Sequence, residues 1–147
     1  MNKVKLFFSL DFTSRLLLLE AFALLGWARI LKNKSFSKVA PSLGKHMQET
    51  SFSYIETNIR IIKHISQAID IMSRYTFWES QCLVRAIAAM KMLERRKIES
   101  TLYLGTAKDE TGKMIAHAWL RSGPFYITGS EGMERFIVVG KFAKKIN

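Results

Sequence analysis

Two stretches of the chain carry apolar residues at the spacing of an α-helix. The run RLLLLEAFALLGWARIL predicts a helix that begins near Thr13 and buries most of its circumference. A second helix is predicted by apolar positions that recur at steps of three and four, namely Ile55, Ile59, Ile62, Ile65, Ile69 and Met72. Between them, residues 33–50 include Pro41, Gly44 and several Ser and Lys residues, so this stretch is expected to form a loop or a short helical turn.

A third helix is predicted within SQCLVRAIAAMKML, residues 80–93. Ser80 is the expected N-cap, because its hydroxyl can accept a hydrogen bond from a free amide of the first turn. Cys82 would then lie in that first turn. The cations at 95–97 suit the negative end of the helix dipole, so the helix is expected to end there.

After this helix the apolar period changes from that of a helix to the alternation of a strand. Residues 100–108, 114–121, 125–129 and 135–142 are predicted strands, separated by the turn-like stretches 109–112, 122–124 and 130–134. Connections this short predict an antiparallel meander. The fold class is therefore α+β in a single domain of residues 1–147, with a helical part at 1–76 and a core at 77–147.

Composition narrows the class of protein further. The chain has 147 residues, enough for one domain with a real core, and 48% of them are hydrophobic. Its single cysteine cannot form an internal disulfide and no C-x-x-C pair suggests zinc, so we expect a cytoplasmic protein without metal or cofactor. Glu20 and Arg29 interrupt the apolar N-terminal run, which argues against a spanning helix and leaves peripheral membrane association as the minor alternative.

The net charge of +11 favours anionic partners without saying which kind. Nucleic-acid binding is disfavoured, because no helix-turn-helix or RNA-binding signature occurs and the cations are not interleaved with aromatic residues in one stripe. A solvated basic surface is the simpler interpretation.

The lone cysteine and one histidine suggest nucleophilic catalysis. A cysteine in the first turn of a helix feels the partial positive charge of free amides, which favours the reactive thiolate. His117 lies on the second predicted strand between Ala116 and Ala118, with Trp119 on its own face. If the sheet packs on the Cys82 helix, His117 could reach the thiol and act as general base and then general acid. A lone cysteine can equally be an inert, small apolar residue.

Residues 82–120 resemble the lasso-peptide leader peptidases, which are transglutaminase-like cysteine proteases. The resemblance is carried by CLVRAIAA at a helix start, ERRK at its end, LYLG at the opening of the sheet, and AHAWL about 35 residues after the cysteine. The first apolar helix and APSLG at 40–44 also look like this family.

The resemblance implies a transglutaminase-like (papain-like) core and a specific reaction. Family members cut a ribosomally made precursor at the junction of leader and core. By this resemblance Cys82 attacks the scissile carbonyl and His117 moves the protons. Backbone amides near Cys82 would hold the oxyanion, with help from Gln81, and Trp119 would help to position the base.

The sequence departs from the family at the residue that should orient the histidine. Family members use an Asp downstream of the His, but no aspartate follows Asp109, and the corresponding stretch reads ITGSEG. Three groups could replace it: the Glu131 carboxylate, the Thr128 hydroxyl or a backbone carbonyl. The nucleophile and the base contribute more than the orienting group in comparable triads, so activity is still expected.

The resemblance also implies partners. In fused family members a small leader-recognition domain, similar to the peptide chaperone of PQQ biosynthesis, precedes the protease. The 147 residues leave no room for it, so we expect a separate recognition protein that docks on the N-terminal helices or a sheet edge. A cyclase similar to asparagine synthetase would act on the cleaved core. A transglutaminase-like acyltransferase, or a catalytically impaired homologue, remains the alternative function.

Overall fold

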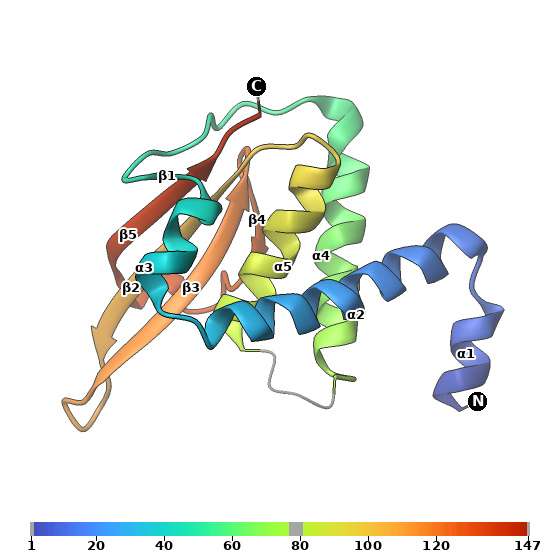
Figure 1. The fold of residues 1–147 in the computed structure, drawn as a ribbon, viewed down its shortest axis with the longest axis horizontal. Helices are drawn as coiled ribbons and strands as arrows, with labels where there is room; N and C mark the ends of the chain where they lie inside the picture. Colours follow the sequence, from blue (N-terminus) through green and yellow to red (C-terminus); the bar gives the residue numbers. More distant parts are fainter. Residues whose placement is uncertain (1, 77–80, 147) are drawn as a thin grey trace.

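The computed structural model describes residues 2–76 and 81–146 (Figure 1). Its α-helices are α1 (Lys3–Ser9), α2 (Phe12–Lys32), α3 (Phe36–Val39), α4 (Ile59–Ser73) and α5 (Cys82–Arg95). Short 3-10 turns are η1 (Ala40–Leu43), η2 (Glu56–Asn58) and η3 (Met133–Arg135). The strands are β1 (Lys45–His46), β2 (Ser100–Lys108), β3 (Met114–Ser122), β4 (Phe125–Thr128) and β5 (Ile137–Lys144). The predicted α+β class is confirmed.

The helix α4 follows the predicted stripe, although it begins one turn later than expected. Ile62, Ile65 and Ile69 are buried in the core, as their spacing requires. Ile55 instead precedes η2 and is exposed. The polar stretch 56–58 is wound into η2, so the regular helix starts only at Ile59.

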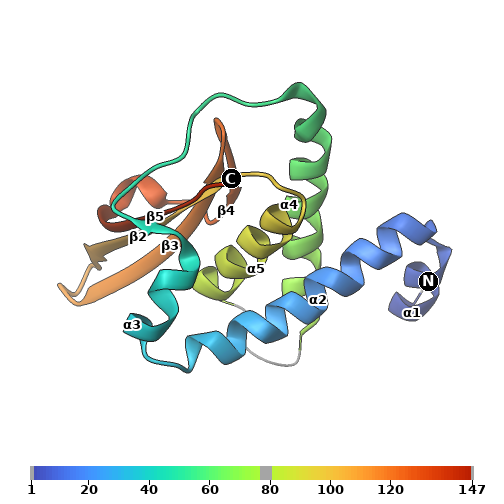
Figure 2. The same ribbon diagram turned by 45° about the horizontal axis from the view of Figure 1, so that its top comes forward.

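The helix α2 buries much less of its surface than its composition predicts. Only Ala21, Leu25 and Ala28 are buried, because α2 packs on α4 and α5 with one face and leaves the others open. Leu16 and Leu19 are half exposed. In both views α1 lies beyond the end of α2, away from the sheet (Figures 1 and 2). No helix among the described residues is long and apolar enough to cross a membrane.

The central helix of the fold is α5, which lies between the sheet and α2 (Figure 1). Ala86, Ala88 and Ala89 are fully buried, and their small side chains let α5 approach its neighbours closely. The N-cap is Gln81, one residue after the predicted Ser80, which lies outside the described residues. Cys82 is the first residue of the helix, as the sequence predicts.

The five strands form one antiparallel sheet in the order β1-β5-β2-β3-β4. The predicted meander is therefore wrong for the last strand, because β5 pairs with β2 and not with β4. The outer side of β4 faces α4, where Ser66 Oγ donates to the carbonyl of Ile127 at 2.7 Å. β5 therefore pairs with the edge of β2 that β3 leaves free, and β1 pairs with the end of β5.

The two faces of the sheet have different surroundings. Leu102, Ala118 and Leu120 face the helices and belong to the main hydrophobic core. The alternating residues Tyr103 and Trp119 lie on the opposite face, where their rings stack with centroids 5.7 Å apart. His117 follows the same alternation and lies on the face of Trp119.

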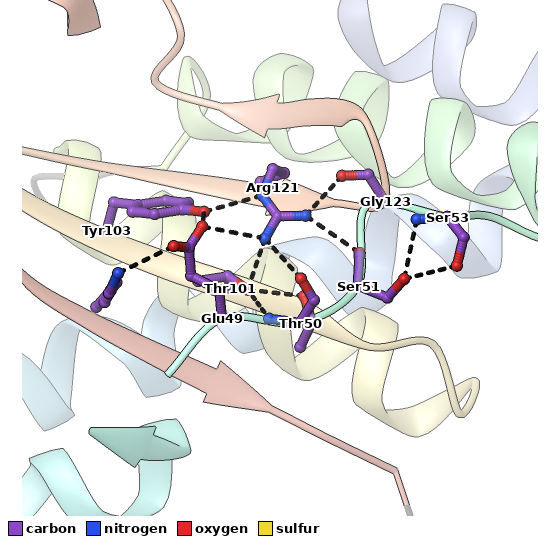
Figure 3. Close-up of polar contacts among 9 residues, drawn as sticks. Glu49, Thr50, Ser51, Ser53, Thr101, Tyr103, Arg121 and Gly123 are labelled. Atoms are coloured by element: carbon purple, nitrogen blue, oxygen red, sulfur yellow. Dashed lines mark hydrogen bonds and ion pairs between the residues drawn. The ribbon is translucent and has the colours of Figure 1, made fainter. Parts of the chain in front are cut away.

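A buried arginine fastens the segment before α4 to this second face. The Arg121 side chain is fully buried, and it donates to the carbonyls of Thr50, Ser51 and Gly123 and to the hydroxyls of Tyr103 and Thr101. Figure 3 shows these contacts converging on the guanidinium. Glu49 completes the network by accepting from the Tyr103 hydroxyl and pairing with Lys141. Residues 49–53 are thereby held against the sheet.

Candidate active site

His117 is held by one hydrogen bond and two aromatic rings. Its Nε2 lies 2.6 Å from the carbonyl oxygen of Gly129. Its ring stacks on Trp119 with centroids 5.7 Å apart and lies 5.0 Å from the ring of Phe136. Gly105 is the residue paired with His117 on the neighbouring strand β2. A Cβ added to Gly105 would come within 2.9 Å of both Phe136 and Trp119. Glycine is required there because the two aromatic side chains close over it beside the imidazole.

The hydrogen bond to Gly129 sets the tautomer of His117. A carbonyl oxygen can only accept, so Nε2 must carry a proton and the neutral ring keeps its free lone pair on Nδ1. Nδ1 is thus the atom that can take a proton from a nucleophile. The partner of Nε2 is therefore a backbone carbonyl, one of the three groups considered from the sequence.

The conformation of Gly129 explains why glycine occupies this position. Its φ is +73°, and an added Cβ would lie 2.4 Å from the carbonyl oxygen of Ala118. Both the left-handed backbone and the close approach to β3 exclude a side chain. Gly129 therefore lets the chain turn sharply after β4 and brings its carbonyl to His117.

Cys82 lies in the layer of helices that packs on the sheet. It begins α5, which packs against β3, and its side chain is partly buried against the hydrophobic core. No hydrogen bond joins its Sγ to His117 among the described residues. The predicted reach of His117 to the thiol is not seen: β3 packs on α5 through the face of Ala118 and Leu120, whereas the imidazole lies on the opposite face with Trp119.

A cavity of about 450 Å³ lies beside His117. β4 ends opposite Leu120, so no strand covers the edge of β3 beside His117. The cavity lies at this uncovered edge. Its lining includes Asp70 from α4, Arg85 from α5, His117 from β3, and Thr128, Gly129 and Glu131 from the end of β4 and the following turn. Arg85 lies three residues after Cys82 on α5, but Cys82 is not among the residues that line the cavity.

The remaining predicted site residues occupy different positions around this cavity. Trp119 stacks on His117, which fits a positioning role. Thr128 lines the cavity, but its hydroxyl is buried without a hydrogen-bond partner. Glu131 is exposed at the cavity, and no hydrogen bond joins it to His117 in the described part of the chain. The Gln81 side chain accepts from Lys32 Nζ at 3.2 Å, so its oxygen faces the end of α2.

The model of one protein family matches the chain over residues 18–141, and its description is the transglutaminase-like superfamily. The chain belongs to the transglutaminase-like superfamily. No curated protein and no solved structure matches it. This superfamily has a papain-like fold, and its members are commonly cysteine-dependent enzymes. Both the Cys82 helix and the His117 strand lie within the matched residues of this transglutaminase-like protein.

Three residues of the site were not singled out by the sequence. Gly105 and Phe136 give no local signal, because their roles depend on which strands become neighbours. Arg85 does carry a signal: it is the only charged residue in the first two turns of α5, three residues after Cys82. No group of three or more His, Cys, Asp or Glu residues within 2–76 and 81–146 is placed to hold a metal ion.

Proposed function

We propose that this transglutaminase-like protein is a cysteine peptidase that removes the leader from a lasso-peptide precursor. The observation that carries the proposal is the oriented imidazole of His117, with Nε2 bonded to Gly129 and Nδ1 free, at the uncovered edge of the strand whose other face packs against the Cys82 helix. The superfamily supports cysteine-dependent chemistry of this general kind. The sequence motifs described above support the finer assignment to lasso-peptide maturation.

The proposed reaction uses both residues in two steps. Cys82 Sγ attacks the scissile carbonyl after its proton moves to His117 Nδ1, and a tetrahedral intermediate forms. His117 then protonates the departing amine of the core, which leaves the leader bound to Cys82 as a thioester. Water, activated by His117, releases the leader and restores the thiol. Amides in the first turn of α5 are the proposed oxyanion donors.

The proposal requires Cys82 and His117 to come within hydrogen-bond distance when substrate binds. The gain from such an assembled pair is large, because positioning alone is worth several orders of magnitude in rate. Gly129 and the aromatic neighbours fix the histidine on the face of β3 away from α5, so the proposal requires the start of α5 to move toward the uncovered edge of β3 beside His117.

The proposed partners are a separate leader-recognition protein and a lasso cyclase. The N-terminal helices offer a docking surface, since Phe8 and Phe12 are 65% and 66% exposed. Apolar side chains of this size on one protruding segment are typical of interaction sites. A basic protein also suits a leader peptide with acidic residues.

Mass spectrometry of the precursor peptide tests the proposal. A lasso-peptide precursor is mixed with wild-type protein or Cys82→Ala, with and without the recognition protein. We expect free leader and free core only with wild-type protein, and faster cleavage when the recognition protein is present. Uncut precursor in every wild-type mixture would refute the peptidase function, and equal rates with and without the recognition protein would refute its role.

A further inference from the structure

Arg85 brings an uncompensated charge to the cavity beside His117. Its side chain is half-buried and lines the cavity with His117 and Thr128. Its Nε is fully enclosed and has no hydrogen-bond partner. Within the described residues, no hydrogen bond or ion pair of any kind reaches its guanidinium.

An arginine in this position destabilises the fold unless a hydrogen-bond acceptor pairs with its guanidinium. A partly desolvated charge without a partner loses hydration and gains no hydrogen bond in return. The two acids of the cavity do not supply the partner. Asp70 is bonded to Arg74, and Glu131 is exposed on the turn after β4 without a described contact to Arg85. The place of the acceptor is therefore open to a ligand.

The guanidinium selects the chemistry of that ligand. Its planar fork of donors matches a carboxylate through two parallel hydrogen bonds, which a neutral amide or hydroxyl cannot reproduce with the same strength. Thr128 adds a hydroxyl, also without a partner, to the lining of the same cavity. A carboxylate at Arg85 would offset the charge that the fold leaves unpaired.

The position of Arg85 on α5 limits which part of a substrate can reach it. Residues three apart on a helix have Cβ atoms about 5–6 Å from one another. An extended peptide advances about 3.3 Å per residue, so a side chain at Arg85 belongs to a residue within about two positions of a carbonyl at Cys82. We infer that Arg85 is a substrate-binding residue that donates hydrogen bonds to the carboxylate of an acidic side chain within two residues of the scissile bond. This inference rests on the proposed peptidase function.

Matched peptides across the leader–core junction test the inference in two ways. The two peptides of a pair differ only in having Asp or Asn at one position. Four positions are tested in turn, the two before and the two after the scissile bond. The kcat/KM for cleavage is measured with wild-type protein, Arg85→Gln and Arg85→Lys. Binding of the same peptides is measured by fluorescence anisotropy with Cys82→Ala, alone and combined with Arg85→Gln. Arg60→Gln removes one exposed cation from α4, away from this cavity, and is the matched control.

At one position or more we expect the Asp peptide to be cleaved and bound at least about 10-fold better than the Asn peptide, equivalent to about 1.4 kcal/mol. The preference should fall below about 2-fold in Arg85→Gln, survive partly in Arg85→Lys and remain intact in Arg60→Gln. Cys82-dependent cleavage without any acid preference, or a preference unchanged by Arg85→Gln, would overturn the inference. Arg85-dependent acid binding without cleavage by the wild-type protein would support the subsite and refute the peptidase.

Discussion

The carbonyl of Gly129 provides a sharp test of how His117 is oriented. In Gly129→Ala the new Cβ would lie 2.4 Å from the oxygen of Ala118, whereas ordinary contacts begin at 3.4 Å. Relieving that contact requires a backbone shift of 1.0 Å, the difference between these two distances. A shift of this size away from the ring would lengthen the 2.6 Å bond to His117 beyond hydrogen-bonding range. Misplacement by about 1 Å can cost about 10²-fold in rate.

A second glycine supplies the matched control. Gly112, in the turn between β2 and β3, has a φ of +83°, close to the +73° of Gly129, but a Cβ added to it would meet no atom within 4 Å. Gly112→Ala therefore carries the cost of the left-handed backbone, about 1–2 kcal/mol of stability, without the clash. Both variants should lose stability, and Gly129→Ala should lose more.

The assay compares kcat/KM for precursor cleavage across pH, together with thermal unfolding of each variant. We expect kcat/KM to fall about 100-fold in Gly129→Ala and to stay within about 2-fold of wild type in Gly112→Ala. The pH profile should change only in Gly129→Ala, because only there does the imidazole lose its partner. Equal kcat/KM in the two variants would show that the Gly129 carbonyl does not orient the base.

Three further predictions concern the turn acid and the buried network. Glu131→Gln should change kcat/KM by less than about 2-fold, because this exposed carboxylate makes no described bond to His117; a loss of 100-fold would make Glu131 the orienting residue. Arg121→Met should lower the free energy of unfolding by about 3–5 kcal/mol in urea titration, since its buried acceptors lose their donors. Burial and the hydrogen bond to Glu49 raise the pKa of Tyr103 to about 12 from 10.0, so folding stability should fall between pH 10 and 12, where only the unfolded chain has lost this proton. Tyr103→Phe should show a shallower fall, and an unchanged one would contradict the assignment.

The local pattern of the sequence predicts the elements that carry the chemistry. The sequence places Cys82 in the first turn of α5, and strict alternation gives β2 its observed bounds and places His117 beside Trp119 on β3. These features depend on residues close together in the chain. Helix period and strand alternation therefore report them directly.

The contacts that orient His117 depend on long-range packing, and the sequence does not reveal them. Phe136 reaches His117 only because β5 crosses to the free edge of β2. The partner of His117 is a backbone carbonyl, which every residue possesses, so no side chain marks it. Its one local signal is Gly129, whose left-handed backbone a sequence pattern cannot distinguish from an ordinary turn.

The covalent intermediate tests the central claim most directly. Wild-type protein is mixed with the precursor peptide and the recognition protein, quenched in acid within the first turnover, and analysed by intact mass and peptide mapping. The account predicts a mass increase equal to the leader acyl group, located on Cys82 and absent from Cys82→Ala. Cleavage of the precursor without this adduct, and undiminished in Cys82→Ala, would contradict it.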